Sequence, residues 1–352
     1  MLSAVASILS TFLVSAPPSV QPIHGVWVTN VASPSMNSPE EVRKTLDICK
    51  QNGVNAVFVV VWNSGMTTYP SEVLNKYIGV KQDPRYKGFD PLAEFIRQGK
   101  DAGIAVHAWF EYGFSYRYGT SPNRWSEKYP QWVGKDREGK SLSKNGFAWW
   151  NALDPGPQEL IKELYLEVVK KYDVAGVQGD DRLPAMPSEG GYDEATLAAF
   201  RKETGAQGTP RPKDRKWVQW RSDRLSAFGK DLYAAVKKAR PDCLVSWAPS
   251  VYPWSMQEYL QDWPAWLRGG YADFVMPQVY RYSYNDYEQT LKQLRSQVSD
   301  ADVKRVFPGL LTALGDGYRM DEELLQQKRK LNTKMGFEGE CLFYLESLRK
   351  KD

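Results

Sequence analysis

DPLAEFIRQGKDAGIAVHAWFEY (residues 90–112) contains one complete helix–strand unit. Asp90 is a favourable N-cap for the helix, and Pro91 suits its first turn. The apolar run that follows, IAVHAWF, fits a strand that is buried on both faces of a parallel sheet. Because the same order of helix and strand returns along the chain, this unit decides the fold.

Eight strand-like segments occur, and a helical segment separates each from the next. The helix before the second strand begins at Ser38, with Pro39 in its first turn and Glu41 completing a capping box. This alternation implies parallel strands with right-handed crossovers, and eight repeats predict an α/β fold of the (β/α)8 TIM barrel type. The predicted strands are residues 25–30, 55–62, 104–112, 174–181, 243–250, 273–280, 305–311 and 340–346.

The rival architecture is a doubly wound open sheet. Such a sheet normally carries a glycine-rich turn for a nucleotide after its first strand. The corresponding turn here, TNVASPSMNSPEE (residues 29–41), has no such pattern. No linker divides the chain, so we expect one (β/α)8 domain over residues 22–352.

The N-terminal stretch MLSAVASILSTFLVSAPPS (residues 1–19) is a short apolar run closed by small residues. It resembles a secretory signal peptide, which predicts export to the periplasm or the exterior. The alternative is a disordered N-terminal arm over residues 1–21. The run is too short for a secure membrane span, and no other segment could cross a bilayer.

Composition excludes several classes of function. The net charge is +4, from 46 basic and 42 acidic residues that are spread along the chain, so we expect no nucleic acid or anionic membrane as partner. Three distant cysteines form neither a disulfide framework nor a zinc spacing and are expected to be buried thiols. With two histidines, His24 and His107, histidine-rich metal chemistry is excluded, and we predict no metal and no cofactor.

Carboxylates follow several of the predicted strands. Catalysis in TIM barrels occurs at the carboxyl ends of the strands, where Glu111, Asp180, Asp181 and Glu346 would gather. Glycoside hydrolysis needs one acid to protonate the leaving oxygen and a second group to stabilise the oxocarbenium charge. Crowded acids also push their pKa values apart, which can keep one protonated near neutral pH. The strand ends therefore favour a glycosidase.

Asp180 is the favoured acid/base, with Asp181 or Glu111 as its catalytic partner. Because neighbouring residues in a strand point to opposite faces, we expect Asp180 and Asp181 to diverge unless a bulge intervenes. Arg182 would tune the carboxylates or bind an acidic substituent of the substrate. The structural alternatives are an Asp181–Arg182 ion pair and a supporting role for Glu111.

Aromatic and amide side chains near the strand ends are candidates for substrate binding. The sequence has 13 Trp and 20 Tyr, and flat side chains at this density often line sugar sites, although many will be core residues. The loop KNGFAWWNALDP (residues 144–155) is expected to form a wall of the cleft. The full set of binding candidates is Asn30, Trp62, Asn63, Trp109, Tyr112, Trp149, Trp150, Gln178, Arg182, Trp247, Gln278, Tyr280, Tyr282 and Glu346.

Several long motifs carry a resemblance to a known family. HGVWVTN (residues 24–30), VAGVQGDDRLPAMPSEGGYDE (174–194) and SWAPSVYPWSMQEYLQDWPAW (246–266) resemble the cyanobacterial branch of glycosyl-hydrolase-like family ten. The resemblance implies a (β/α)8 barrel related to glycosidases, with the catalytic acid at Asp180 or Asp181. It also implies a distant similarity to the hydrolase domain of biofilm proteins that cut partly deacetylated poly-N-acetylglucosamine.

Three functions follow as hypotheses. The first is an exported glycoside hydrolase that acts on a polysaccharide or a cell-envelope glycan. The second is a catalytically inactive glycan-binding protein, because the seventh strand carries no carboxylate of the kind used as nucleophile by the largest glycosidase clan. The third is a barrel enzyme for phosphorylated metabolites, which ALGDGYR (residues 313–319) after that strand would suit.

Overall fold

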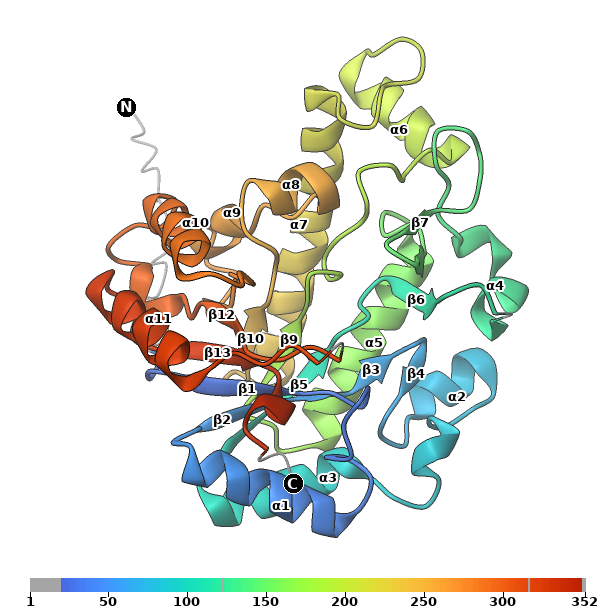
Figure 1. The fold of residues 1–352 in the computed structure, drawn as a ribbon. Helices are drawn as coiled ribbons and strands as arrows, with labels where there is room; N and C mark the ends of the chain where they lie inside the picture. The colour runs from blue at the N-terminus through green and yellow to red at the C-terminus, as the bar shows by residue number, and fades with distance from the viewer. Residues whose placement is uncertain (1–19, 122, 316, 350–352) are drawn as a thin grey trace, which may run out of the picture.

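Eight parallel strands form one sheet in the computed structural model of the protein, which describes residues 20–121, 123–315 and 317–349 (Figure 1). The order of the strands in the sheet is β11-β10-β9-β5-β2-β1-β13-β12. Each of the eight predicted strands is present. Their bounds are β1 His24–Val28, β2 Ala56–Val60, β5 Ala105–Phe110, β9 Gly176–Gly179, β10 Leu244–Trp247, β11 Phe274–Val275, β12 Gly309–Leu311 and β13 Glu340–Phe343.

The two outer strands of this order, β11 and β12, also meet. Parallel bridges join Val275 to Val306 and Gln278 to Gly309. The backbone N–H of Phe307 donates to the carbonyl of Val275 at 2.9 Å. The sheet therefore curls into a ring, and the predicted (β/α)8 barrel is confirmed.

Helices cover the outside of the ring and connect its strands (Figure 1). Seven of them have at least eleven residues: α1 Pro39–Gln51, α3 Pro91–Ala102, α5 Pro155–Lys171, α6 Glu194–Thr204, α7 Arg215–Ala239, α10 Tyr284–Ser296 and α11 Glu322–Lys334. The shorter ones are α2 Glu72–Ile78, α4 Arg124–Lys128, α8 Trp254–Tyr259 and α9 Trp263–Arg268. Short 3₁₀ helices lie at Pro84–Tyr86, Pro130–Trp132, Val303–Arg305 and Leu345–Ser347.

The predicted N-cap residues form hydrogen bonds in the first turns of α1 and α3. Oγ of Ser38 accepts from the N–H of Glu41 at 3.2 Å, and a carboxylate oxygen of Asp90 accepts from the N–H of Ala93 at 3.0 Å. These bonds satisfy N–H groups that have no partner within the helix. The apolar faces of α1 and α3 then bury against the sheet, which fixes the direction of each crossover.

The interior of the ring is packed with side chains. His107 stacks on Phe58 with 4.7 Å between ring centroids, and burial lowers the pKa of His107 to about 3. His107 is therefore a neutral core residue. His24, which begins β1, pairs with Glu340 at 3.4 Å at the opposite end of the strands from their carboxyl ends.

Two small antiparallel sheets lie in long loops and were not expected from the sequence. β3 (Trp62–Asn63) pairs with β4 (Met66–Thr67), and β6 (Ser115–Tyr118) pairs with β8 (Phe147–Trp149), which pairs with β7 (Ser143–Lys144). In Figure 1, β7 and α6 stand above the strands of the barrel. These loops build one side of the barrel mouth.

Other expectations concern the chain as a whole. The three cysteines are free and buried, which confirms the prediction of unpaired thiols. Within residues 20–121, 123–315 and 317–349, no helix has the length and apolar character needed to cross a membrane. The predicted signal peptide lies outside the described residues.

Candidate active site

Three carboxylates converge on Arg182 at the carboxyl ends of β5 and β9. Nη2 of Arg182 lies 3.3 Å from Oδ2 of Asp180 and 3.6 Å from Oε1 of Glu111, and its Nη1 lies 3.2 Å from Oδ1 of Asp181. The prediction that Asp180 and Asp181 diverge is wrong. β9 ends at Gly179, and the N–H of Leu183 donates to the carbonyl of Asp180 at 2.9 Å in a turn, so the alternation of a strand no longer applies. We call Glu111, Asp180, Asp181 and Arg182 the carboxylate cluster.

Arg182 is fixed in the cluster from several sides. Its Nε donates to the backbone carbonyl of Glu111 at 3.0 Å, and its guanidinium lies 4.7 Å from the ring centroid of Phe147. Its own carbonyl accepts from the N–H of Phe114 at 3.0 Å. Gly113 makes this approach possible, because a Cβ there would lie 2.1 Å from that carbonyl oxygen. The guanidinium of Arg182 is therefore held in a fixed position at the mouth of the barrel.

Asp180 is almost completely buried, with 3% of its surface exposed. Nε2 of Gln278 donates to Oδ1 of Asp180 at 2.8 Å and to the carbonyl of Ala248 at 3.0 Å. Burial raises the pKa of Asp180 well above its usual range, the charge of Asp181 raises it further, and Arg182 opposes both effects. A raised pKa is the property that a carboxyl needs in order to act as a general acid.

Glu111 is the second buried acid of the cluster. Nδ2 of Asn63 donates to its Oε2 at 2.6 Å. Burial raises the pKa of Glu111, while Arg182 and the Asn63 hydrogen bond lower it. The sequence predicts Asn63 as a ligand for sugar hydroxyls, but the structure gives it a direct role in holding Glu111.

An apolar cavity of about 310 Å³ opens beside Glu111. Among the described residues that line it, Glu111 is the only one with a charged side chain, and the exposed ring of Tyr118 stands at its edge. Phe147 belongs to the loop that the sequence predicts as a wall of the cleft. The other lining residues are Thr29, Val31, Ala32, Tyr112, Leu314, Gly315, Phe343 and Tyr344.

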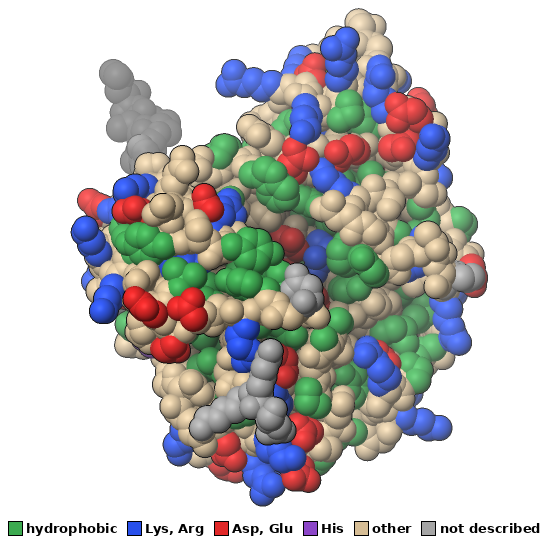
Figure 2. All heavy atoms as spheres, in the orientation of Figure 1, with side chains coloured by type: hydrophobic (Ala, Val, Ile, Leu, Met, Phe, Trp, Pro, Cys, Tyr) green, Lys and Arg blue, Asp and Glu red, His purple; other side chains and the backbone are tan. Residues whose placement is uncertain are grey.

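A second cavity of about 470 Å³ lies beside Gln278, and we call it the amide-lined cavity. Glu111 of the carboxylate cluster lines the apolar cavity. Gln278, which donates to Asp180 of the cluster, lines the amide-lined cavity. Figure 2 shows acidic and basic side chains inside a hollow that hydrophobic side chains border. The lining residues of the second cavity are Ser250, Val251, Tyr252, Pro253, Trp254, Gln257, Gln278, Tyr280, Arg281 and Gln293.

Five tryptophans predicted as sugar platforms are buried. Each has at most 2% of its surface exposed, so none can stack on a ligand in this structure. Trp150, for example, stacks on Tyr116 with 5.5 Å between ring centroids. Large apolar rings gain most by filling the space between the barrel and its loops, so these five belong to the core. They are Trp62, Trp109, Trp149, Trp150 and Trp247.

Three other polar candidates form no hydrogen bond or ion pair with the cluster within the described part of the chain. Gln178 is completely buried in the ring, where its Oε1 accepts from the indole of Trp27 at 2.8 Å. Glu346 accepts from Ser33 at 2.7 Å and pairs with Arg349 at 3.0 Å, and none of its contacts within the described part of the chain is with the cluster. Asn30 is buried, although its neighbours Thr29 and Val31 line the apolar cavity.

The three tyrosine candidates have different environments. Tyr112 lines the apolar cavity, and Tyr280 lines the amide-lined cavity. Tyr282 is 58% exposed and packs edge-on against Tyr318, outside both linings. Sequence reasoning missed Tyr118, the last residue of β6, and Trp254, the first residue of α8, because both lie beyond the barrel strands and the barrel-strand pattern does not mark them.

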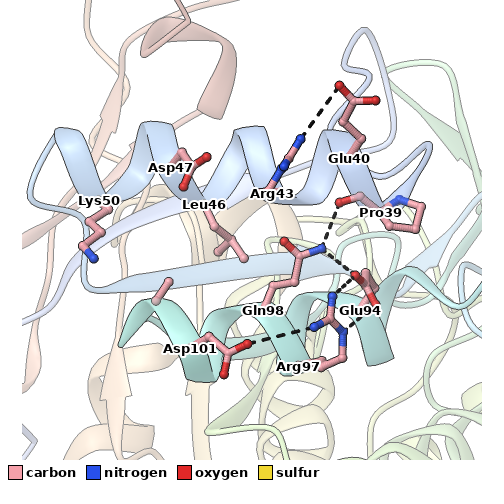
Figure 3. A pocket seen from close by; sticks show the side chains of 11 residues that line it. Pro39, Glu40, Arg43, Leu46, Asp47, Lys50, Glu94, Arg97, Gln98 and Asp101 are labelled. Atoms are coloured by element: carbon pink, nitrogen blue, oxygen red, sulfur yellow. Dashed lines mark hydrogen bonds and ion pairs between the residues drawn. The ribbon is translucent and has the colours of Figure 1, made fainter.

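A groove of about 640 Å³ also lies outside the barrel, between α1 and α3 (Figure 3). Several of its charged side chains pair with each other: Arg43 lies 4.0 Å from Glu40, and Arg97 lies 2.5 Å from Glu94. No residue at the carboxyl end of a barrel strand lines it, so we place no chemistry there. Among the described residues, no group of three or more His, Cys, Asp or Glu has the arrangement of a metal site.

Comparisons with known proteins identify relatives of the chain. It is 26% identical over 323 residues to glycosyl hydrolase YngK of Bacillus subtilis (strain 168), a match that covers 78% of this chain and 58% of that protein. It is 25% identical over 309 residues to glycosyl hydrolase DigH of Escherichia coli (strain K12), with coverage of 74% and 66%. The chain thus spans less than two thirds of either relative.

Two solved structures of other proteins share the fold. The PgaB (BpsB) glycoside hydrolase domain from Bordetella bronchiseptica superposes with a TM-score of 0.63 at 16% identity, covering 93% of this chain and 95% of that one. The catalytic domain of β-amylase from Paenibacillus polymyxa gives 0.64 at 14% identity, with 92% of both chains covered. At these identities the likeness establishes the fold.

The family follows from a sequence profile. The profile described as Glycosyl hydrolase-like 10 matches residues 22–329, which include every barrel strand except β13 and all four members of the carboxylate cluster. The resemblance seen in the strand-end motifs is thereby confirmed. The chain belongs to the glycosyl hydrolase-like 10 family.

Proposed function

We propose that the protein hydrolyses glycosidic bonds in a polysaccharide or a cell-envelope glycan. The observation that carries the proposal is the environment of Asp180, a buried carboxyl with a raised pKa at the mouth of a glycosidase-type barrel. A general acid for glycoside cleavage needs this property, because it must hold a proton at a pH where free carboxyls are ionised. The names of the relatives, both glycosyl hydrolases, support the same reaction class.

Asp180 would transfer its proton to the glycosidic oxygen as the bond from that oxygen to the anomeric carbon breaks. Glu111, ionised and held by Arg182 and Asn63, would stabilise the positive charge that develops on the sugar ring. Water then adds to the anomeric carbon, and the proton it releases returns to Asp180. We prefer Glu111 to Asp181 as the partner because Glu111 lines a cavity that a sugar can enter.

In this proposal Arg182 determines which carboxyl of the cluster is protonated and which is ionised. One cation faces three carboxylates, and it cannot keep all of them ionised in a buried site. The proton then stays on the group that is hardest to ionise, and we assign it to Asp180. In this proposal Arg182 is a positioning residue that keeps Glu111 available as an anion.

A glycan-binding protein without catalysis is the second candidate. The ion pairs of Arg182 with every carboxylate of the cluster favour it, since paired carboxylates are less free to react. The residues that follow β12, Thr312 and Ala313, also provide no carboxylate. Binding of an oligosaccharide with no product after long incubation would support this candidate.

The test is a panel of bacterial polysaccharides incubated with the wild-type protein and with Asp180→Asn, Asp181→Asn and Glu111→Gln. We expect cleavage by the wild type and strong loss with Asp180→Asn and Glu111→Gln. Asp173→Asn is the matched control, because Asp173 precedes β9 at the far end of the strand and its side chain is 90% exposed. Equal cleavage by all variants would refute the assignment. We also propose that the protein is exported, which N-terminal sequencing of the mature form would test.

A further inference from the structure

Trp254 is unique among the tryptophans of the chain. All 13 lie in the described residues, and 12 of them are buried. Trp254, in the helix that follows β10, is 44% exposed and lines the amide-lined cavity. Exposing an indole costs hydrophobic free energy, so a single exposed one beside a cavity points to a ligand that covers it.

The polar groups around Trp254 are free to bind. Gln257 and Gln293 are exposed, and neither side-chain amide is hydrogen bonded within the described chain. Arg281 donates only to the carbonyl of its neighbour Tyr280, at 2.7 Å, and has no ion pair with a described carboxylate. A flat indole with amide and guanidinium donors at its side matches a pyranose ring, which has an apolar face and a rim of hydroxyls.

Two hydrogen bonds fix the loops that line the amide-lined cavity. Nε2 of Gln297 donates to the carbonyl of Tyr252 at 2.8 Å, which fixes the loop after β10. Nζ of Lys328 donates to the carbonyl of Arg281 at 2.7 Å, which fixes the loop after β11. These two anchors hold the groups that line the cavity in a preorganised arrangement.

We propose that the amide-lined cavity is a sugar-binding subsite, in which Trp254 stacks on one pyranose unit while Gln257, Gln293 and Arg281 bind its polar groups. Gln278 links this subsite to Asp180, so the bound unit lies next to the bond that is cleaved. The apolar cavity, on the Glu111 side, would hold the unit across that bond. The inference rests on the proposed function for the identity of the ligand as a glycan.

Fluorescence quenching tests the subsite directly. Acrylamide should quench the emission of Trp254 selectively, because the other tryptophans are buried. We use three probes: the hexamer of β-1,4-linked N-acetylglucosamine, the pentamer of β-1,6-linked N-acetylglucosamine, and cellohexaose. Saturation with at least one probe should protect the emission of Trp254 from quenching by acrylamide. The Trp254→Phe variant should lack this quenchable part of the tryptophan emission. Protection by none of the three would overturn the proposal.

Substitutions give a second readout. We expect Trp254→Ala, and the double variant Gln257→Ala with Gln293→Ala, to weaken the affinity for the protecting probe by about tenfold, without change in the unfolding temperature. Gln326→Ala on the exposed face of α11 is the control and should bind normally. Unchanged affinity in both cavity variants would overturn the subsite.

The two proposals fail in different ways. If the wild-type protein cleaves a glycan while no probe protects Trp254, the subsite is wrong and the hydrolase assignment stands. If a probe protects Trp254 but the wild type releases no product from any glycan, the subsite stands and the protein is a glycan-binding protein.

Discussion

Nε2 of Gln278 lies 2.8 Å from Oδ1 of Asp180, so a side chain from the loop after β11 holds an acid at the end of β9. The same nitrogen also donates to the carbonyl of Ala248, which follows β10. Three neighbouring strands of the barrel thus meet at one amide. One carboxyl oxygen of Asp180 is fixed by this bond, and the other faces Arg182.

The first prediction concerns the pH dependence of stability. The pKa of Asp180 is raised by folding above its ordinary value of 3.8, so at higher pH the folded state keeps a proton that the unfolded state releases. The free energy of unfolding therefore falls as pH rises through this window. Asp180→Asn removes the titrating group, and we expect the variant to gain stability over the wild type from pH 4 to pH 8.

Urea unfolding at several pH values measures this difference, with Asp173→Asn as the exposed control. A difference that stays constant with pH would show that Asp180 titrates normally in the folded protein. The same Asp180→Asn variant should lower kcat by about 10²–10⁴-fold, the usual contribution of a general acid. In the wild type, kcat should decline on the alkaline side as Asp180 loses its proton.

A second prediction concerns Arg182. Arg182→Gln leaves Glu111, Asp180 and Asp181 together without a cation, and breaking a buried ion pair of this kind costs about 3–5 kcal/mol. We expect that loss at pH 8 and a smaller loss at pH 4, where Asp180 and Glu111, whose pKa values burial raises, are protonated and repel each other less. Denaturant unfolding at the two pH values measures it.

Arg97→Gln is the control for Arg182→Gln. Arg97 pairs with Glu94 on the surface, its side chain is 62% exposed, and its loss should cost below about 1 kcal/mol at either pH. If Arg182→Gln behaved like this control, the guanidinium would not be holding the carboxylate cluster together.

A third prediction separates backbone strain from a close contact. Gly113 and Gly119 both have left-handed backbone, with φ of 50° and 76°, so alanine at either site costs about 1–2 kcal/mol. Only at Gly113 would the new Cβ clash, at 2.1 Å from the carbonyl oxygen of Arg182, whereas nothing lies within 4 Å at Gly119. We expect Gly113→Ala to lose more stability and also activity, because Arg182 must move.

Thermal unfolding and hydrolysis rates of the two alanine variants measure this prediction. Gly119→Ala should keep the activity of the wild type. Equal losses of stability and activity in both variants would mean that the Gly113–Arg182 approach has no role in placing the cluster.

The barrel could be predicted from the sequence because its signals are local and repeated. A strand buried on both faces must be apolar throughout, as NAVFVVVW (residues 55–62) is, and the caps at Ser38 and Asp90 mark where helices begin. The carboxylates at the ends of β5 and β9 follow from the same register. Residues 90–112 therefore predict both the helix–strand unit that the barrel repeats and the position of Glu111 in the carboxylate cluster.

The details of the site depend on contacts that no local pattern encodes. The direction of Asp181 depends on where β9 ends, and one residue of difference reverses the expected face. Trp149 lies in a small sheet within a loop, and the sequence cannot tell such a buried ring from an exposed ring such as that of Trp254. Gln278 reaches Asp180 across 98 positions of sequence, a pairing that depends on β9, β10 and β11 lying side by side in the sheet.

The last prediction uses two aromatic residues near the mouth. Trp150 has no exposed surface, and Trp150→Ala should cost about 3–5 kcal/mol in the free energy of unfolding, with little change in KM at temperatures where the variant is folded. Tyr118 is 63% exposed at the edge of the apolar cavity, so Tyr118→Ala should change stability by no more than about 0.5 kcal/mol. Because a sugar in that cavity would cover the Tyr118 ring, we expect its removal to raise KM several-fold. Steady-state kinetics on a cleaved oligosaccharide, together with urea unfolding, distinguish the two effects. A rise in KM for Trp150→Ala with intact stability would place the substrate against the buried tryptophans and refute this description of the cleft.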